Sequence, residues 1–187
     1  MTESPDRDAL ALLQRHDPRG FELSYRRYAE RIFGFLVRLS GSRALAEDLF
    51  QHTFLRLAEA GPRLGIDSDL RAWLFTVARN AFHSQARTRR AALRMDADLR
   101  VTASVTGASP DEGMALAELE HALAQLSAAD RELLLLFGVE GLTHAELASV
   151  LGLDQVTVRK RVSRARARLA EALDEAAEVM SKSGVRK

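Results

Sequence analysis

THAELASVLGLDQVTVRKRVSRARARL, residues 143–169, carries the most specific structural signal in the chain. Thr143 and Glu146 can form a capping box, which would start a helix of about two turns. Gly152 suits the turn that ends this helix, and Asp154 can cap a second, longer helix. Two helices of these lengths, separated by a glycine turn, predict a helix-turn-helix.

The second helix of this motif has two contrasting faces. At about 100° per residue, its apolar positions fall within an arc of about 60° and form the expected core face. These positions are Val158, Val162, Ala165 and Leu169. Polar and small residues lie roughly opposite them, namely Lys160, Ser163, Arg164 and Ala167. Arg159 and Arg166 lie on one flank, and Arg161 and Arg168 lie nearer the other.

Between Gln155 and Ala170 there are six basic residues and no acidic one. A solvated helical face usually mixes both signs at a spacing of four residues, and this one does not. Like charges repel one another unless an anion is present, so the pattern favours DNA binding. The alternative is a helical face that is merely solvated. If four or five of these charges reach phosphates, log affinity should fall with log salt at a slope of roughly −4.

Charge is unevenly distributed along the 187 residues, although the formal net charge is only +1. Residues 1–94 carry a net charge of +5, residues 95–154 carry −9 and residues 155–187 carry +5. Such asymmetry indicates separate tasks for separate segments.

The composition, rich in Ala, Leu, Arg and Glu with 4 Pro and 11 Gly, predicts an all-α fold. We expect two small helical domains joined by a flexible acidic linker, the second containing the helix-turn-helix. The expected bounds are 5–93, 94–113 and 114–180. The chain has no cysteine, which excludes disulfides and thiolate metal sites. No run approaches about 18 apolar residues, so we expect a cytoplasmic protein with no membrane span.

Capping residues and helix breakers predict the other helix boundaries. A first helix should open at Ser4-Pro5-Asp6, and further helices should cover about residues 19–39, 43–60, 70–90 and 155–180. Ser127 should cap a short apolar helix. The helix before it is expected to bury Leu116, Leu119, Leu123 and Leu126.

Residues 73–83 place three aromatic side chains beside a basic run. Such aromatics can stack on unpaired bases while the charges hold the backbone. The helical wheel puts Leu74, Val77, Ala78 and Ala81 on one face, and Phe75, Arg79, Phe82 and Ala86 toward the other. The alternative interpretation is that Trp73, Phe75 and Phe82 simply belong to the core, and the composition does not separate the two.

Residues 46–55 predict a helix with Asp48, Gln51 and His52 on one exposed arc. Leu45, Leu49 and Phe54 are available for a hydrophobic contact, so the spacing suggests a surface for a partner protein. An ordinary amphipathic helix explains the pattern equally well.

Taken together, these segments resemble bacterial RNA polymerase sigma factors of the extracytoplasmic-function (ECF) class. The resemblance runs from about Phe21 to Leu173. It is carried by AEDLFQHTF (46–54), WLFTVARN (73–80), GLTHAELA (141–148) and VTVRKRVSRAR (156–166). The chain departs from the usual family pattern at His52, Ser84 and Ser127.

The resemblance implies a protein that binds core RNA polymerase, directs it to specific promoters and promotes DNA opening, with no cofactor. The implied polymerase-binding residues are Asp48, Gln51 and Phe54. The residues implied to contact the −10 promoter element are Leu64, Asp67, Arg71, Trp73, Thr76, Arg79, Asn80 and His83. The residues implied to contact the −35 promoter element are Thr157, Arg159, Lys160, Ser163, Arg164 and Arg166. The family also suggests an anti-sigma partner and an acidic linker that lies in the RNA path of the polymerase. A linker whose charge merely keeps it soluble and extended explains the acidic residues equally well.

Two other classes of protein account for the sequence less completely. A helix-turn-helix repressor or activator would explain residues 143–169 but leaves the segments around Gln51 and Trp73 without a role. A helical enzyme is disfavoured because the five histidines are dispersed. The sequence also contains no metalloprotease motif, phosphate-binding loop or nucleophile elbow.

Overall fold

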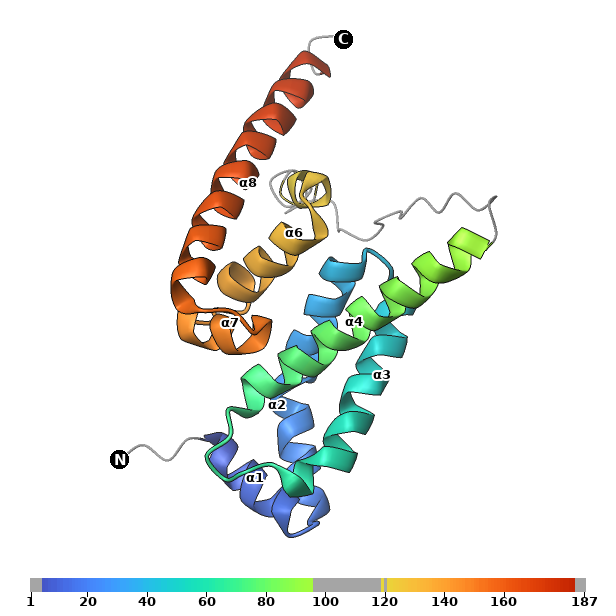
Figure 1. Cartoon of the computed structure of the whole chain (residues 1–187), viewed down its shortest axis with the longest axis vertical. Helices are drawn as coiled ribbons and strands as arrows, with labels where there is room; N and C mark the ends of the chain where they lie inside the picture. Colours follow the sequence, from blue (N-terminus) through green and yellow to red (C-terminus); the bar gives the residue numbers. More distant parts are fainter. Residues whose placement is uncertain (1–4, 96–118, 120, 184–187) are drawn as a thin grey trace. The chain divides into compact units, whose positions relative to one another are not determined.

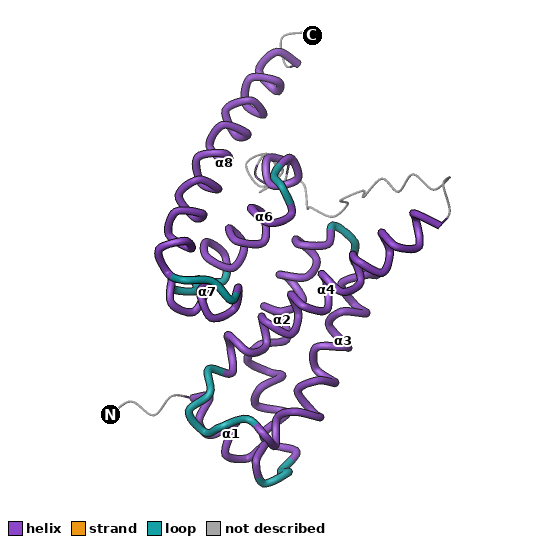
Figure 2. Tube along the Cα trace, in the orientation of Figure 1, coloured by secondary structure: helices purple, strands orange, loops and turns teal. Residues whose placement is uncertain are grey.

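The computed structural model of the chain describes residues 5–95, 119 and 121–183, and every regular element in these residues is helical. The chain divides into two units, Met1–Ser104 and Val105–Lys187. Figure 2 shows helices joined by short loops within each unit. The expected fold class, all-α with a helix-turn-helix in the second unit, is confirmed. The expected linker lies outside the described residues beyond Met95.

The described residues of the first unit form four α-helices, of which α2, α3 and α4 pack against one another while α1 packs on α2 (Figure 1). Their bounds are α1 Pro5–Gln14, α2 Pro18–Ser40, α3 Arg43–Ala60 and α4 Leu70–Met95. A short 3-10 turn, Gly61–Arg63, follows α3 at the expected glycine-proline stop. Helix α4 extends five residues beyond the expected end at residue 90.

Side-chain caps determine where the helices of this unit begin. The Ser42 hydroxyl accepts a hydrogen bond from the Leu45 N–H at 3.3 Å, as its position before α3 predicted. The Asp69 carboxylate accepts one from the Ala72 N–H at 2.8 Å and so caps α4. Gly41 ends α2 in the left-handed conformation with φ 65°, the conformation that glycine adopts without strain. The structure adds Asp17, whose carboxylate caps α2 at the Arg19 N–H.

Helix α1 lies so close to α2 that no side chain fits between them at Gly20. A Cβ atom on Gly20 would lie 2.6 Å from the Leu13 nitrogen and 2.9 Å from the Ala9 oxygen. The Tyr28 hydroxyl ties the same two helices together, since it donates to the Asp6 carboxylate at 2.7 Å. Burial and this carboxylate raise the pKa of Tyr28 far above its usual value, so Tyr28 remains a hydrogen-bond donor.

The core of the first unit forms around an edge-to-face contact between Phe35 of α2 and Phe75 of α4, with ring centroids 5.4 Å apart. Both rings are fully buried. The sequence left open whether Phe75 stacks on bases or belongs to the core, and the structure places it in the core, although the helical wheel put it on the face opposite Leu74. The helical wheel groups Phe75 with Arg79. Burial of a large aromatic ring between α2 and α4 is favourable enough to place Phe75 in the core nevertheless. Trp73 and Phe82 are half-buried.

The second unit comprises a helical segment at residues 121–125, α6 Ala128–Leu134, a π-helical segment Leu135–Val139, α7 His144–Leu151 and α8 Gln155–Ser183. Ser127 caps α6 through the Asp130 N–H, as predicted. Of the leucines expected to be buried before Ser127, Leu126 is buried while Leu119 and Leu123 are half-buried. Leu116, like the proposed cap at Ser4, lies outside the described residues.

We predict that Gly20→Ala destabilises the first unit by about 1–3 kcal/mol, because the new methyl group would force α1 and α2 apart. Gly34→Ala in the same helix is the matched control. A Cβ at Gly34 approaches only the flexible end of Arg38, at 3.1 Å, so the gain in helix propensity should stabilise α2 by up to about 1 kcal/mol. Urea unfolding followed by the fluorescence of Trp73, the single tryptophan, measures both. Equal effects of the two substitutions would contradict the close approach at Gly20.

Candidate nucleic-acid interface

The helix-turn-helix begins with a complete capping box. The Thr143 N–H donates to the Glu146 carboxylate at 2.6 Å, and the Glu146 N–H donates to the Thr143 hydroxyl at 3.2 Å. Helix α7 ends at Gly152, which has φ 65° and so turns the chain toward α8. The predicted start, turn and end of this first helix are confirmed.

Asp154 holds the beginning of α8 through two hydrogen bonds from Thr157. The Thr157 hydroxyl donates to one carboxylate oxygen at 2.6 Å, and the Thr157 N–H donates to the other at 2.8 Å. Both hydrogen bonds lower the pKa of Asp154, and the bond from the hydroxyl has the larger effect. The carboxylate that caps α8 therefore stays ionised near neutral pH. The hydroxyl of Thr157, a candidate for DNA contact, is thus already used as a donor within the protein.

Helix α8 presents a buried face and an exposed cationic face, as predicted. Val158, Val162 and Ala165 are buried, and Leu169 is half-buried. On the exposed face lie Arg159, Lys160, Arg161, Ser163 and Arg164. We call these five residues the α8 stripe.

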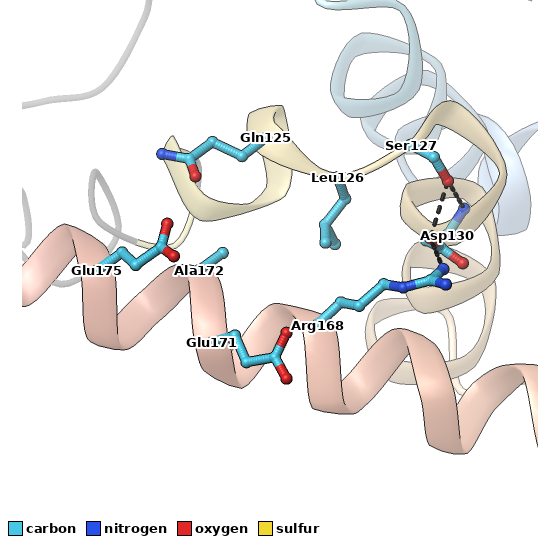
Figure 3. Close-up of a pocket in the computed structure, with 8 residues that line it drawn as sticks. All are labelled: Gln125, Leu126, Ser127, Asp130, Arg168, Glu171, Ala172 and Glu175. Carbon is cyan, nitrogen blue, oxygen red and sulfur yellow. Dashed lines mark hydrogen bonds and ion pairs between the residues drawn. The ribbon is translucent and has the colours of Figure 1, made fainter.

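Two further arginines of α8 are engaged within the second unit. The Arg168 guanidinium forms an ion pair with Asp130 of α6 at 2.6 Å, and Ser127 donates to the same carboxylate (Figure 3). The Arg166 guanidinium lies over the ring of Phe137 at 4.7 Å from its centroid. Phe137 also packs against the ring of His144 at 4.9 Å. Arg166 is therefore oriented by a cation–π contact, which the sequence alone did not predict.

The cations of the α8 stripe differ from these two arginines in their electrostatics. Within the described part of the chain, none of its four basic side chains forms an ion pair. They are held on one rigid helix at adjacent turns, where like charges are mutually unfavourable. An anionic surface would remove this repulsion, and the spacing and length of the stripe fit one groove of duplex DNA.

The side of α8 that faces residues 125–130 has the opposite character. A pocket of about 360 Å³ opens there, and Figure 3 shows Leu126 and Ala172 at its apolar part with Glu171 and Glu175 on α8. Negative carboxylates at this position disfavour a phosphate ligand. Among the side chains of α8 that the structure describes, the cationic ones therefore lie in its first half.

In the first unit, the implied −10 residues lie on α4 and on the loop before it. The loop is held by the Gln14 side-chain amide, which donates to the Leu64 carbonyl at 2.7 Å. Asp67 is exposed and lies 3.9 Å from the Arg7 guanidinium. Arg71, Trp73, Thr76, Arg79 and His83 are half-buried, and Asn80 is exposed. Trp73, Thr76 and Asn80 recur at a helical spacing that places them on one side of α4.

The implied polymerase-binding residues separate into exposed and buried positions on α3. Asp48, Gln51 and His52 are exposed, whereas only 4% of Phe54 is exposed. The Phe54 ring packs against Phe50 and Tyr25, with centroids 4.9 Å and 5.0 Å away. Phe54 therefore supports this surface from inside. It does not present its own side chain to a partner.

The two most exposed large apolar residues among those described are ones that sequence reasoning did not single out. Leu55 on α3 is 62% exposed and continues the spacing of Asp48, Gln51 and His52. Val156 at the start of α8 is 59% exposed. Leu55 follows His52 by three residues, and Val156 precedes Arg159 by three residues. Extending each series of exposed polar positions by one helical interval would have found both.

The described residues contain no group of three His, Asp or Glu side chains placed to hold a metal ion. None of the helices described is long and apolar enough to span a membrane.

Comparisons with known proteins match both units. Residues 24–92 match the family model of sigma-70 region 2, and residues 116–169 match that of sigma-70 region 4. The chain is 36% identical over 141 residues to the ECF RNA polymerase sigma factor EcfG of Rhodopseudomonas palustris, covering 74% of this chain and 77% of that protein. It is 35% identical over 159 residues to the RNA polymerase sigma factor CarQ of Myxococcus xanthus, covering 83% and 90%.

Two solved structures share the fold. One is the sigma factor RpoE in complex with the anti-sigma factor NepR from Bartonella quintana, with a TM-score of 0.75, 33% identity, and coverage of 82% of this chain and 96% of that one. The other is CnrH in complex with the cytosolic domain of CnrY, with a TM-score of 0.72, 24% identity, and coverage of 92% and 99%.

We predict that the two kinds of basic residue on α8 respond differently to salt. Lys160→Ala should make the slope of log DNA affinity against log salt shallower by about one, because one phosphate contact is lost. Arg168→Ala should leave that slope unchanged and lower the melting temperature, because it removes the ion pair with Asp130. Fluorescence anisotropy with a labelled duplex and thermal unfolding measure the two effects. The assignment is wrong if both variants change the slope equally.

Proposed function

Because the chain belongs to the ECF RNA polymerase sigma factors, which direct core RNA polymerase to specific promoters, we propose that its two helical units divide promoter recognition between them. The first unit, residues 5–93, would bind the polymerase and the −10 element. The second unit, residues 114–180, would bind the −35 element. Residues 94–113 would form the acidic linker between them.

The α8 stripe is the observation that carries the proposal for the −35 element. It combines four cations with Ser163 on the exposed face of a capped helix that follows a glycine turn. Arginine and lysine pair well with the acceptor atoms of guanine, and serine accepts or donates to either kind of base pair. The candidate −35 residues are Thr157, Arg159, Lys160, Ser163, Arg164 and Arg166. Of these, Arg166 would contact the DNA while its guanidinium lies over the Phe137 ring.

The −10 element would be bound by α4 and the loop before it. Trp73 is half-buried and offers part of its ring for stacking, while Thr76 and Asn80 offer hydrogen-bonding groups on the same side of α4. The loop would receive a base that leaves the duplex, with Leu64 and Asp67 beside it. Unstacking a base costs a few kcal/mol, and stacking on an aromatic side chain returns about 1–3 kcal/mol.

Core RNA polymerase would bind the exposed side of α3. Asp48, Gln51 and Leu55 lie there at helical spacing, and the apolar side chain of Leu55 among these polar residues offers a contact for a partner protein. The aromatic cluster around Phe54 would keep α3 rigid beneath this surface. We call the exposed residues Asp48, Gln51, His52 and Leu55 the α3 surface.

We also propose that the protein acts in the cytoplasm, where the polymerase is, and that it is not an enzyme. RpoE and CnrH were each solved with a protein partner, in the case of RpoE an anti-sigma factor. By this similarity the chain would have an anti-sigma partner of its own. A repressor or activator that does not join the polymerase would leave the α3 surface without a role.

The decisive experiment is run-off transcription on a genomic promoter library. Core polymerase with this protein should start transcription at promoters that neither initiates alone. The control is core polymerase with a primary sigma factor, which shows that the core is active. Silence with this protein on an active core would overturn the proposal, and DNA binding without polymerase binding would support the repressor.

We predict that Leu55→Ala weakens binding to core polymerase by about three- to tenfold, because it removes an exposed apolar contact from the α3 surface. Folding should not change, since 62% of the side chain is exposed. Arg26→Ala on α2 is the matched control, because Arg26 is exposed in a surface ion pair with Glu22. Surface plasmon resonance with immobilised core polymerase measures both. Equal affinities of the two variants would exclude Leu55 from the interface.

A further inference from the structure

Val156 is an apolar residue exposed at the start of a charged helix. It is the second residue of α8, two positions after the Asp154 cap, and 59% of it is exposed. Val156 gains little from burial there, because more than half of it is exposed, and a β-branched residue is only a moderate helix former. Stability of the unit therefore gives no reason for a valine at this position.

The position of Val156 on α8 connects it to the α8 stripe. Arg159, Lys160 and Ser163 follow it at intervals of three, four and seven residues, and all of them are exposed. Side chains at these intervals lie on the same face of an α-helix. The buried residue Val158 lies on the other side of the helix. Val156 is therefore the first residue of the surface that would meet DNA, and it is the only large apolar one there among the described residues.

The N-terminal turns of a recognition helix approach base edges most closely. In the major groove the thymine C5-methyl group is the apolar feature that distinguishes an A·T pair, and apolar side chains recognise it by contact. A valine places two methyl groups at this depth without a polar atom to satisfy. Ser163 and the basic residues of the stripe, in contrast, serve hydrogen-bonding edges and phosphates.

We propose that Val156 is a specificity-determining residue that contacts the C5-methyl group of one thymine in the −35 element. The inference rests on the proposed function, because it requires that α8 bind this element in the major groove. It adds a preference for an A·T pair at one position, which the cationic residues do not provide.

The test removes the methyl group from the DNA. The complete holoenzyme is assembled from the full chain and core polymerase, and a promoter selected by run-off transcription supplies the −35 duplex. Each thymine of this element, on both strands, is replaced in turn by deoxyuridine, which lacks only the C5-methyl group. We expect one replacement to weaken binding by about three- to fivefold, which corresponds to the loss of one buried methyl group.

The valine is then shortened. With Val156→Ala, the thymine and uracil duplexes should bind equally, at the affinity that the unaltered protein shows for uracil. Val139→Ala is the matched control, because Val139 is 51% exposed on the π-helical segment of the same unit and outside the stripe. This control should keep the full preference for thymine. Circular dichroism checks that Val156→Ala remains folded, which its exposure and the high helix propensity of alanine lead us to expect.

Three results would overturn the inference. The first is equal binding of all uracil duplexes by the unaltered holoenzyme. The second is a loss of affinity in Val156→Ala that is the same for thymine and uracil. The third is a −35 element without an A·T pair. In all three cases the holoenzyme would still transcribe from its promoters, and Arg164→Ala would still weaken its binding to the −35 element. A failure of the proposed function would instead abolish promoter-specific transcription altogether.

Discussion

The position at which α8 begins is the constraint on which the DNA-binding surface depends. Gly152 turns the chain in the left-handed conformation, and Asp154 fixes the first turn of α8 through two hydrogen bonds from Thr157. Successive residues of a helix are rotated by about 100°. A start displaced by one residue would therefore rotate the cationic stripe toward the core and bring Val158 to the surface. The cap and the turn, more than the number of arginines, place the charges.

Within α8 the basic residues divide into two groups by what they contact. Arg168 pairs with Asp130, and Arg166 lies over Phe137, so both connect α8 to the elements before it. The cations of the stripe have no such neighbours among the described residues and are available to an anionic ligand. The first unit follows the same principle, because the Phe54 ring packs beneath α3 while Leu55 faces outward. In both units, internal contacts hold a helix rigid so that its other face can bind.

Much of the fold could be predicted from the sequence because local chemistry determines helix ends. The capping residues Ser42, Ser127 and Thr143 act where they were expected. The buried and exposed faces of α8 also follow from its period, since a helix that packs on one side must place its apolar residues there. The family resemblance, carried by short motifs in a particular order, agreed with the comparisons for both units.

The sequence by itself therefore determined the helices, the helix-turn-helix and the cationic face, because these depend on residues close together in the chain. Only the tertiary structure decided that Phe75 and Phe54 are buried and that Leu55 and Val156 are exposed. Periodicity assigns a residue to a face, but the neighbouring helix decides which side chains that face can cover. Phe75 meets Phe35 from a helix far away in sequence, and Arg166 meets Phe137 in the same way. Such pairings need the assembled fold.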